Sequence, residues 1–432
     1  MGKNVLVLGS GGREHAICQA IAKSPLLGKL YIAPGNPGTA SLGENIDVSP
    51  EDFPKVIELI DKREIQILIC GPEAPLALGL MDNVEDFFSS KENKPVLIGP
   101  KQFAAQLESS KQFAKEFLFR HHIPTAAYKS FDQTQLQEAI EFIEQMTPPI
   151  VLKADGLAAG KGVLICHDHL EACEELSQML NGKFGAASEK VVIEEFLSGI
   201  EFSIFALTNG KDYILLPEAK DYKRIGEGDT GLNTGGMGAV SPVPFVSPEL
   251  KQKVIQNIIE PTINGLQKDN IEYCGFIFFG LILVGNEPFV IEYNCRLGDP
   301  ETEAILPRIE TDLLALCNEI HTDTFGRQNL NISDQHSAVI VLASGGYPEF
   351  FQKGISIQLP EQTEGTVFHS GTKLKERGLI TSGGRVFAVN ALGNHPQVAL
   401  QKANSMAEQI HFEGKYFRKD IGLDLQHLWN SK

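Results

Sequence analysis

The sequence predicts an α/β protein with three parts: an N-terminal doubly wound parallel-sheet domain, a central two-lobed region and a small C-terminal α+β domain. Short apolar strands alternate with helical patterns in the first hundred residues, turn signals bracket a small α+β lobe in the middle, and strand-like segments with glycine turns occur near the end. A chain of 432 residues is long enough for about three domains of ~150 residues. We expect the domains at 1–108, 109–318 (with the small lobe at about 124–196) and 330–432.

In the N-terminal part, strands alternate with helical patterns, which favours a parallel sheet covered by helices on both faces. The expected strands are residues 5–8, 30–33, 67–70 and 95–98. Such sheets bind ligands in the loops beyond the carboxyl ends of their strands. Polar, turn-rich stretches lie at those ends, at residues 9–15, 34–39 and 71–75. We therefore expect these three loops to cluster in space.

The central and C-terminal parts mix helices and strands. In the small lobe we expect a strand at 126–130, a helix at 133–146 that ends before Pro148 and Pro149, strands at 150–154 and 162–166, a helix at 169–180 and a strand at 191–197. After it we expect strands near 202–207 and 213–216, a glycine-rich loop at 225–241, a helix at 248–268, and strands at 274–284 and 288–293. The segments VIVLASGGYP and RVFAVNALG and a helix at 396–410 indicate a separate C-terminal piece.

Composition and charge argue against several classes of function. A formal net charge of −17 is unlike the basic surface of a nucleic-acid-binding protein. The longest apolar run, residues 275–285, is well short of the ~18 residues of a membrane span. The seven cysteines form no CxxC pair and mostly lie in apolar runs, as reduced thiols do in a cytosolic protein. We therefore predict a cytoplasmic protein with no nucleic-acid or membrane partner. We also expect a monomer or weak homodimer, although composition and charge do not determine the oligomeric state.

A glycine-rich turn, GSGGREH at residues 9–15, follows the first strand. It does not fit the dinucleotide fingerprint G-x-G-x-x-G, because Glu14 occupies the position of the third glycine. Its other features, backbone N–H groups at a helix N-terminus with Arg13 beside them, are those of an anion site. A tight turn without a ligand is the alternative interpretation.

The segment VLKADGLAAGKG, residues 151–162, leads an apolar strand into a loop with two lysines, Lys153 and Lys161. It is not a Walker A P-loop, because Asp155 stands at the first glycine position and Gly162 follows the lysine. The loop is also expected to join two strands rather than a strand and a helix. A glycine-rich hairpin with lysines is suited to lie as a flap over a nucleoside triphosphate, and a plain flexible hairpin is the alternative.

Two later segments also carry chemistry. Residues 226–238 contain six glycines, and such a loop in a compact domain is either mobile or held by a ligand. In FVIEYNCRLGDPE, the residues Glu292, Asn294 and Arg296 alternate along an expected strand and therefore share a face. A carboxylate beside an amide oxygen suits Mg²⁺, and an arginine there can bind a carboxylate or an oxyanion. A solvated strand face is the alternative.

Together these segments resemble the glycinamide ribonucleotide synthetase (phosphoribosylamine–glycine ligase) family of the ATP-grasp superfamily. The matching segments are VLVLGSGGREHA, YIAPGNPGT, GPEAPLALG, AAQLESSKQFAKEFL, VLKADGLAAGKGV, DTGLNTGGMGAVSP and VIEYNCRLGDPET, in order between residues 5 and 302, and SGGRVFAV at 382–389. The resemblance covers essentially the whole chain. It implies an ATP-grasp fold whose central region binds ATP. It also implies the ligation of glycine to 5-phosphoribosylamine through a glycyl phosphate, a step of de novo purine biosynthesis.

The resemblance also implies roles for individual residues. For ATP it implies Lys111, Lys153, Asp155, Gly156, Gly160, Lys161, Gly162, Glu194, Glu195, Leu197 and Glu201. For the other substrates it implies Gly12, Arg13, Asn36, Glu73, Asp221, Lys223, Gly235 and Gly236. Glu292 and Asn294 would hold Mg²⁺ (or Mn²⁺), and Arg296 would stabilise a tetrahedral oxyanion as the catalytic residue.

The sequence departs from the family pattern in two places. Lys220 and Tyr222 flank Asp221 where the family often has Gln and His, so a role that rests on the histidine has no matching residue here. No acidic residue occurs between Tyr273 and Asn286, where ATP-grasp enzymes generally carry a metal carboxylate. Two alternatives stay open. One is another ATP-grasp ligase or a biotin-dependent carboxylase-like enzyme, and the other is a module that binds ATP without turnover.

Overall fold

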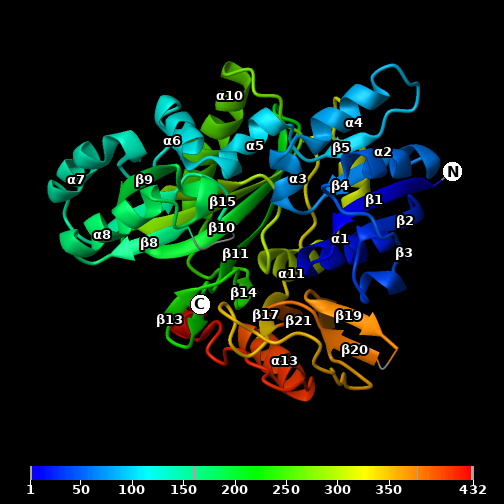
Figure 1. The fold of residues 1–432 in the computed structure, drawn as a ribbon. Coiled ribbons are helices and arrows are strands. Elements are labelled where there is room, and N and C mark those ends of the chain that lie inside the picture. The colour runs from blue at the N-terminus through cyan, green and yellow to red at the C-terminus, as the bar shows by residue number, and fades with distance from the viewer. Residues whose placement is uncertain (1, 159–161, 377, 430–432) are drawn as a thin grey trace.

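The computed structural model describes residues 2–158, 162–376 and 378–429. Its elements form three groups, and the short helix α11 (Glu301–Ile305) lies where they meet (Figure 1). The N-terminal elements are drawn in blue, the central ones mostly in cyan and green, and the C-terminal ones in orange and red. Among the helices in these described ranges, none combines the length and the apolar character that crossing a lipid bilayer requires.

The N-terminal group is a parallel sheet with the strand order β3-β2-β1-β4-β5. Its strands are β1 (Lys3–Gly9), β2 (Leu27–Pro34), β3 (Glu44–Asn45), β4 (Ile67–Cys70) and β5 (Val96–Ile98), and its helices are α1 (Gly12–Ala22), α2 (Phe53–Lys62), α3 (Glu73–Ala77) and α4 (Leu80–Phe88). Alternate residues of β1 enter different cores: Val5 and Val7 lie on one side, and Leu6 and Leu8 on the other. The predicted doubly wound sheet is confirmed.

The small lobe is an antiparallel sheet with the strand order β6-β9-β7-β8, packed against two helices. Its elements are β6 (Tyr128–Asp132), α7 (Leu136–Glu144), β7 (Ile150–Ala154), β8 (Val163–Cys166), α8 (His169–Leu180) and β9 (Lys190–Glu195). Helices α5 (Gln102–Ser109) and α6 (Lys111–Arg120) connect it to the N-terminal group. The flap predicted at 155–162 joins two strands, β7 and β8, as expected.

One eight-stranded sheet, β16-β15-β10-β11-β14-β17-β21-β18, runs through the central and C-terminal groups. Its strands are β10 (Ile200–Thr208), β11 (Tyr213–Asp221), β14 (Gly238–Ser241), β15 (Gly275–Val284), β16 (Glu287–Asn294), β17 (His336–Ala343), β18 (Thr366–His369) and β21 (Arg385–Gly393). The C-terminal strands therefore continue the central sheet instead of forming a sheet of their own, and Val240 of β14 pairs with Ala338 of β17.

Helices and one hairpin cover this sheet. They are α9 (Pro248–Val254), α10 (Glu260–Lys268), α12 (Leu313–Asn318), α13 (Pro396–Gln409), α14 (Gln426–Trp429) and the hairpin β19 (Thr372–Lys375) with β20 (Gly378–Thr381). The helix predicted at 248–268 contains a π-helical turn at Ile255–Ile259. Pro261 follows this turn, and a proline has no N–H to donate to the preceding turn.

The glycine-rich segment 225–241 is not the irregular loop that we predicted. Residues Arg224–Gly226 (β12) and Thr230–Asn233 (β13) pair as a hairpin, and β14 follows. Gly228 (φ +67°) and Asp229 (φ +53°) make the turn in the left-handed region that glycine adopts without strain. Glycine content indicated a loop, whereas here it permits a tight turn.

Candidate active site

Two buried lysines converge on one carboxylate oxygen beside the small lobe. The Nζ atom of Lys153 on β7 lies 2.9 Å from Oε2 of Glu194 on β9, and Nζ of Lys115 on α6 lies 3.0 Å from the same oxygen. The three residues are at most 5 % exposed. Two ammonium groups and one carboxylate leave an excess of positive charge in this buried place, which suits an anionic ligand.

Lys111 and Lys115 lie one helical turn apart on α6 and line the same small cavity. Its other lining residues are Leu107, Ala114, Leu118, Glu194, Ile291, Glu292 and Tyr293. Lys111 and Lys153 were predicted as ligands of the phosphates, whereas Lys115 was missed. Its spacing of four from Lys111 places both lysines on one helix face, but ordinary surface lysines have the same spacing, so the sequence does not distinguish Lys115 from them.

Asp155 holds the N-terminus of α6. Its Oδ1 accepts hydrogen bonds from the backbone N–H of Gln112 at 2.7 Å and from the Ser110 hydroxyl at 3.0 Å. Its backbone carbonyl accepts the N–H of Lys111 at 3.1 Å. Asp155 thereby fixes the helix end from which the Lys111 side chain extends.

The flap is anchored at both described ends. The N–H of Gly156 donates to the carbonyl of Ala187 at 2.9 Å, and the carbonyl of Gly162 accepts the N–H of Ala154 at 2.8 Å. A Cβ atom on Gly156 would lie 2.8 Å from Cα of Ala187, so only glycine fits there. The predicted ATP residues Gly160 and Lys161 lie outside the described residues.

The end of β9 joins the small lobe to the central sheet. Glu194 points inward, and the next residue, Glu195, is exposed and accepts the N–H of Ala127 through Oε1 at 2.8 Å. Leu197 follows the strand and is half-buried. The alternation of the strand therefore separates the two glutamates: Glu194 faces the cavity, and Glu195 fastens the segment before β6.

Lys223 lies among acidic side chains at the end of β11. Its Nζ is 2.8 Å from Oε2 of Glu201, and this pairing holds the pKa of Glu201 below its ordinary value. Burial raises the pKa of Asp221, and burial and Asp221 together raise the pKa of Glu301 to about 8. Burial would also raise the pKa of Glu292, but Lys223 and other nearby cations more than offset it and lower that pKa. Ionised Glu292 therefore lies close to carboxyl groups that hold their protons more firmly.

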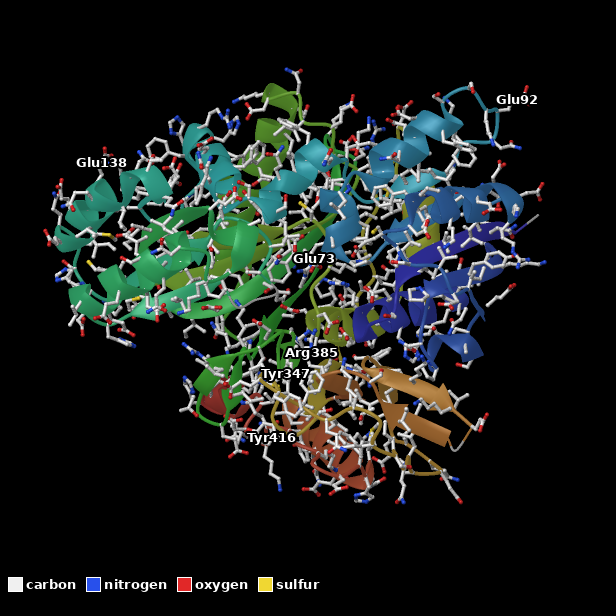
Figure 2. All side chains as sticks on the ribbon, in the orientation of Figure 1. Glu73, Glu92, Glu138, Tyr347, Arg385 and Tyr416 are labelled. Atoms are coloured by element: carbon white, nitrogen blue, oxygen red, sulfur yellow. The ribbon has the colours of Figure 1, made fainter. Side chains whose placement is uncertain are left out.

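Arg296 connects the N-terminal and central groups. Its Nη2 lies 2.8 Å from Oε1 of Glu108, and its Nε lies 3.4 Å from Oε2 of Glu73. Glu73 faces the central elements from the start of α3 (Figure 2). Nη2 of Arg296 also lies 3.4 Å from Oδ1 of Asn294. Strand β16 ends at Asn294, so the predicted alternation along a strand does not extend to Arg296. Glu108 was not singled out from the sequence.

Gly12 and Arg13 begin α1 and lie against the segment after β16. The Nε atom of Arg13 donates to Oε1 of Glu14 at 2.6 Å, and its Nη1 donates to the carbonyl of Leu297 at 3.2 Å. A Cβ atom on Gly12 would collide with Oε1 of Glu303. Neither carboxyl oxygen of buried Glu303 has a hydrogen-bond partner in the described part of the chain, and burial raises the pKa of this group.

Gly235 and Gly236 are held from the C-terminal group. Nη1 of Arg385 donates to the carbonyl of Gly235 at 2.6 Å and pairs with Oδ1 of Asp299 at 3.0 Å. The hydroxyl of Tyr347 accepts the N–H of Gly235 at 3.1 Å. Figure 2 shows Arg385 and Tyr347 close together where the C-terminal strands meet the central elements. Neither residue was singled out from the sequence.

Asn36 joins the N-terminal loops to the C-terminal group. Its Nδ2 donates to the carbonyls of Ser10 and His369, both at 2.9 Å. Its Oδ1 accepts the N–H groups of Gly38 at 2.8 Å and Thr39 at 3.1 Å. Both sides of the amide are thus bonded within the protein, and they bring two of the predicted loops together.

Glu292 and Asn294 lie two positions apart on β16, and each carries a side-chain oxygen of the kind that binds a hard cation. Glu292 is ionised at neutral pH, and hard oxygen ligands of this kind suit Mg²⁺. Among residues 2–158, 162–376 and 378–429, no group of three or more His, Cys, Asp or Glu side chains is placed to hold a metal ion. A metal that keeps several waters and binds substrate phosphates fits such a pair.

The chain matches the three domains of one family over most of its length. The N domain of phosphoribosylglycinamide synthetase matches residues 3–108, the ATP-grasp (A) domain residues 109–302, and the C domain residues 337–424. The phosphoribosylamine–glycine ligase of Pasteurella multocida is 44% identical over 425 residues, which are 97% of each chain. That of Yersinia pestis is 44% identical over 430 residues, 97% of this chain and 98% of its own.

Solved structures agree with these matches. A phosphoribosylamine–glycine ligase from Thermotoga maritima has a TM-score of 0.83 and 36% identity, covering 96% of this chain and 99% of that chain. The biotin carboxylase domain of a Hydrogenobacter thermophilus 2-oxoglutarate carboxylase has a TM-score of 0.73 and 17% identity, covering 100% and 96%, which shows a common fold. The predicted ATP-grasp fold is confirmed. The chain belongs to the phosphoribosylglycinamide synthetase family.

Proposed function

We propose that this protein joins glycine to 5-phosphoribosylamine with ATP, giving glycinamide ribonucleotide, ADP and phosphate in de novo purine biosynthesis. The observation that carries the proposal is the 44% identity to relatives named phosphoribosylamine–glycine ligase over 97% of the chain. Glycine's carboxylate is a poor electrophile, and its oxygen is a poor leaving group. Transfer of the γ-phosphoryl group to it gives a glycyl phosphate, which the amine of phosphoribosylamine then attacks.

The domains 1–108, 109–318 and 330–432 divide the work, with the small lobe at about 124–196 closing over ATP. The extents of the parallel sheet and of the lobe's antiparallel sheet support these boundaries. The family matches at 3–108, 109–302 and 337–424 lie within them.

ATP binds at the lysine cluster. Lys111 and Lys153 contact the phosphates, and Glu194 lies at the edge of adenine. The other ATP residues are Asp155, Gly156, Gly160, Lys161, Gly162, Glu195, Leu197 and Glu201. Phosphoryl transfer needs positioning and charge neutralisation rather than a protein nucleophile. The excess positive charge around Glu194 supports this placement.

Glu292 and Asn294 would hold Mg²⁺ (or Mn²⁺), with waters and phosphate oxygens completing its shell. The ion would supply charge neutralisation at the transferring phosphoryl group. The lowered pKa of Glu292 supports this role, because a metal ligand must be deprotonated. This chain's own contribution is to keep that carboxylate ionised with Lys223 nearby.

The remaining residues bind and orient the acyl phosphate and the amine. Gly12, Arg13 and Glu73 hold phosphoribosylamine, together with Asn36, Asp221, Lys223, Gly235 and Gly236. Arg296 stabilises the oxyanion that forms when the amine attacks. Its contact with Glu73 supports this assignment, because it brings the catalytic guanidinium beside a residue of the amine's site. The flap excludes water, which would hydrolyse the acyl phosphate.

Release of ADP tests this function. The assay contains ATP, Mg²⁺, glycine and freshly generated phosphoribosylamine, each omitted in turn, and the product is identified by its mass. We expect release only when all four are present, with an amide as the product. Release without the amine, or with another acid in place of glycine, would favour a different ATP-grasp ligase or a carboxylase. Nucleotide binding with no release would favour a binding module.

A further inference from the structure

Lys115 is a buried lysine to which the ligation assigns no role. Its side chain is 3 % exposed, and its Nζ contacts three oxygens: Oε2 of Glu194 at 3.0 Å, Oγ1 of Thr125 at 2.7 Å and the carbonyl of Ala126 at 3.3 Å. An ammonium group has three hydrogens, so these contacts use all of them. Burying a lysine is costly unless it is paired in this way. Lys115 is therefore held in one position.

One carboxylate oxygen of Glu194 is paired with lysines, and the other is buried without a hydrogen-bond partner among the described residues. Lys115 and Lys153 both bind its Oε2. Its Oε1 is buried and has no hydrogen-bond partner within the described ranges. Glu194 also lines the small cavity that Lys111 and Glu292 share. An unpaired buried acceptor is costly, and such groups in a cavity wall are typically satisfied by a ligand or by water.

We propose that Lys115 is a positioning residue for recognition of the base: it fixes Oε2 of Glu194 so that Oε1 accepts the 6-amino group of adenine. This inference rests on the proposed function, in which ATP is the nucleotide. An ionised carboxylate can only accept hydrogen bonds. It therefore attracts the 6-amino group of adenine and repels the 6-oxo group of guanine. The orientation of this one carboxylate sets the preference between the two bases.

The two lysines have different freedom to move. Beyond Glu194, Lys153 has one further partner among the described residues, the carbonyl of Ile291 at 3.3 Å. The Thr125 hydroxyl that holds Lys115 is itself fixed, because it donates to the carbonyl of Val290 at 2.7 Å. When a triphosphate draws Lys153 away, Lys115 remains as the counter-ion of Glu194. Without Lys115, that movement would leave a buried carboxylate unpaired.

Lys115 is charged at the pH where the enzyme would work. Burial lowers the pKa of its ammonium group to about 8, against the opposing effect of Glu194. At neutral pH most molecules therefore keep the positive charge that anchors Oε2.

The test compares bases in the variant Lys115→Met, which removes the charge and keeps the length of the side chain. Binding of non-hydrolysable ATP and GTP analogues is measured by calorimetry without glycine or amine. We expect affinity for the ATP analogue to fall about 10- to 100-fold and the preference over the GTP analogue to shrink by a similar factor. Binding of inorganic tripolyphosphate should not change, whereas Lys153→Met should weaken it.

Two further variants keep the test decisive. Arg120→Met changes another cation of the same helix, 53% exposed at its side chain, and should bind both analogues like the wild type. Lys115→Met with Glu194→Gln removes both charges, so it should fold more stably than the single variant, and it should show the same reduced adenine preference as Glu194→Gln alone, because Lys115 acts through Glu194. An unchanged ratio of the two affinities in Lys115→Met, or a further change of that ratio when Lys115→Met is added to Glu194→Gln, would overturn the proposal. Wild-type protein that prefers the ATP analogue and forms no amide would overturn the ligase function and leave this role of Lys115 standing.

Discussion

Two buried polar clusters in this protein are built in opposite ways. The junction cluster (His15, Asn36, Thr39, Asn45 and His369) joins the N-terminal loops to β18, and the nucleotide cluster (Lys115, Lys153 and Glu194) lies beside the small lobe. In the junction cluster, burial lowers the pKa of His15 to about 3 and of His369 to about 4, so both rings are neutral. The nucleotide cluster carries an excess positive charge, and its buried acceptor Oε1 of Glu194 has no hydrogen-bond partner in the part of the chain that the structure describes.

The difference separates polar groups that hold the fold from polar groups that bind. In the junction cluster, Asn36 uses its amide in five hydrogen bonds, and His15 accepts the N–H of His369 through Nδ1 at 2.9 Å. Because these groups already have partners within the protein, the Asn36 side chain would serve the proposed phosphoribosylamine site by fixing the shape of its loop. Uncompensated charge and an open acceptor raise the free energy of the empty site, and a complementary ligand recovers it.

Lys153→Met should give the largest effect, and it should act on the reaction rather than on the fold. We expect kcat/KM for ATP to fall about 10²- to 10³-fold, because the variant loses the charge that we propose contacts the phosphates. The melting temperature should stay close to that of the wild type, because Lys115 still pairs with Glu194. Steady-state kinetics and thermal unfolding measure the two quantities on the same preparation.

A variant in the junction cluster, Thr39→Val, should change stability and leave the kinetics with ATP unchanged. The Thr39 hydroxyl accepts the N–H of Asn36 at 2.8 Å and lies 2.8 Å from Oδ1 of Asn45. Thr39→Val should therefore lower the free energy of unfolding by about 1–3 kcal/mol, since buried partners are left unpaired. Its KM for ATP should not change. If Lys153→Met were the less stable of the two and kept a normal KM, the contrast between the clusters would be wrong.

Acid should weaken the junction cluster. His15 accepts a hydrogen bond at Nδ1 and must stay unprotonated, with a folded pKa of about 3 against about 6.5 in the unfolded chain. Between these values the unfolded chain binds more protons, so the free energy of unfolding falls as pH falls from 6.5. At about 1.4 kcal/mol per pH unit, His15 should account for a loss of about 2–3 kcal/mol by pH 4.5.

Urea unfolding of wild type and His15→Asn between pH 7 and 4.5 measures this loss. Asparagine places an acceptor oxygen near the position of Nδ1 and does not titrate in this range. The variant should therefore show a flatter dependence on pH, while carboxylates that titrate in both proteins cancel in the difference. Parallel curves would mean that His15 is not the group that senses acid at the junction.

The sequence predicted best what depends on local pattern. The strands of the N-terminal sheet were predicted because four short apolar runs alternate with helical patterns. Lys153 was singled out because it stands between an apolar strand and a glycine-rich loop, and its contact with the phosphates stays a prediction. The hairpin β12–β13 was missed, because glycine content shows that a turn is allowed and says nothing about which strands pair. Lys115 was missed for a different reason: in KQFAKEFLF it has the spacing of an ordinary helix-surface lysine.

Contacts between residues distant in sequence determine whether a charged residue such as Lys115 is buried or exposed. Lys115 is buried because Glu194 and Thr125, from other elements, close over it. The ion pair of Arg385 with Asp299 and the burial of the unpaired Glu303 carboxyl both depend on the packing of three groups of elements around α11. The sequence alone does not show this packing. The sequence shows that such a residue is charged, but it does not show whether the charge is paired with solvent, with the protein or with a ligand. That distinction is the one that separates the two clusters.

Asp155 lies beside the nucleotide cluster, but its carboxylate has hydrogen-bond partners within the protein, as the groups of the junction cluster do. Its variants therefore test whether Asp155 supports the fold or binds the nucleotide. Its carboxylate accepts hydrogen bonds from Gln112 and Ser110 at the N-terminus of α6. Asp155→Ala should lower the free energy of unfolding by about 1 kcal/mol, as loss of a helix cap does. It should raise KM for ATP only a few-fold, through the shifted Lys111. Asp155→Asn keeps an acceptor at the helix end and should recover most of both. A large loss of ATP affinity in Asp155→Asn at normal stability would instead mean that the charge itself serves the nucleotide, and that Asp155 belongs with Lys153.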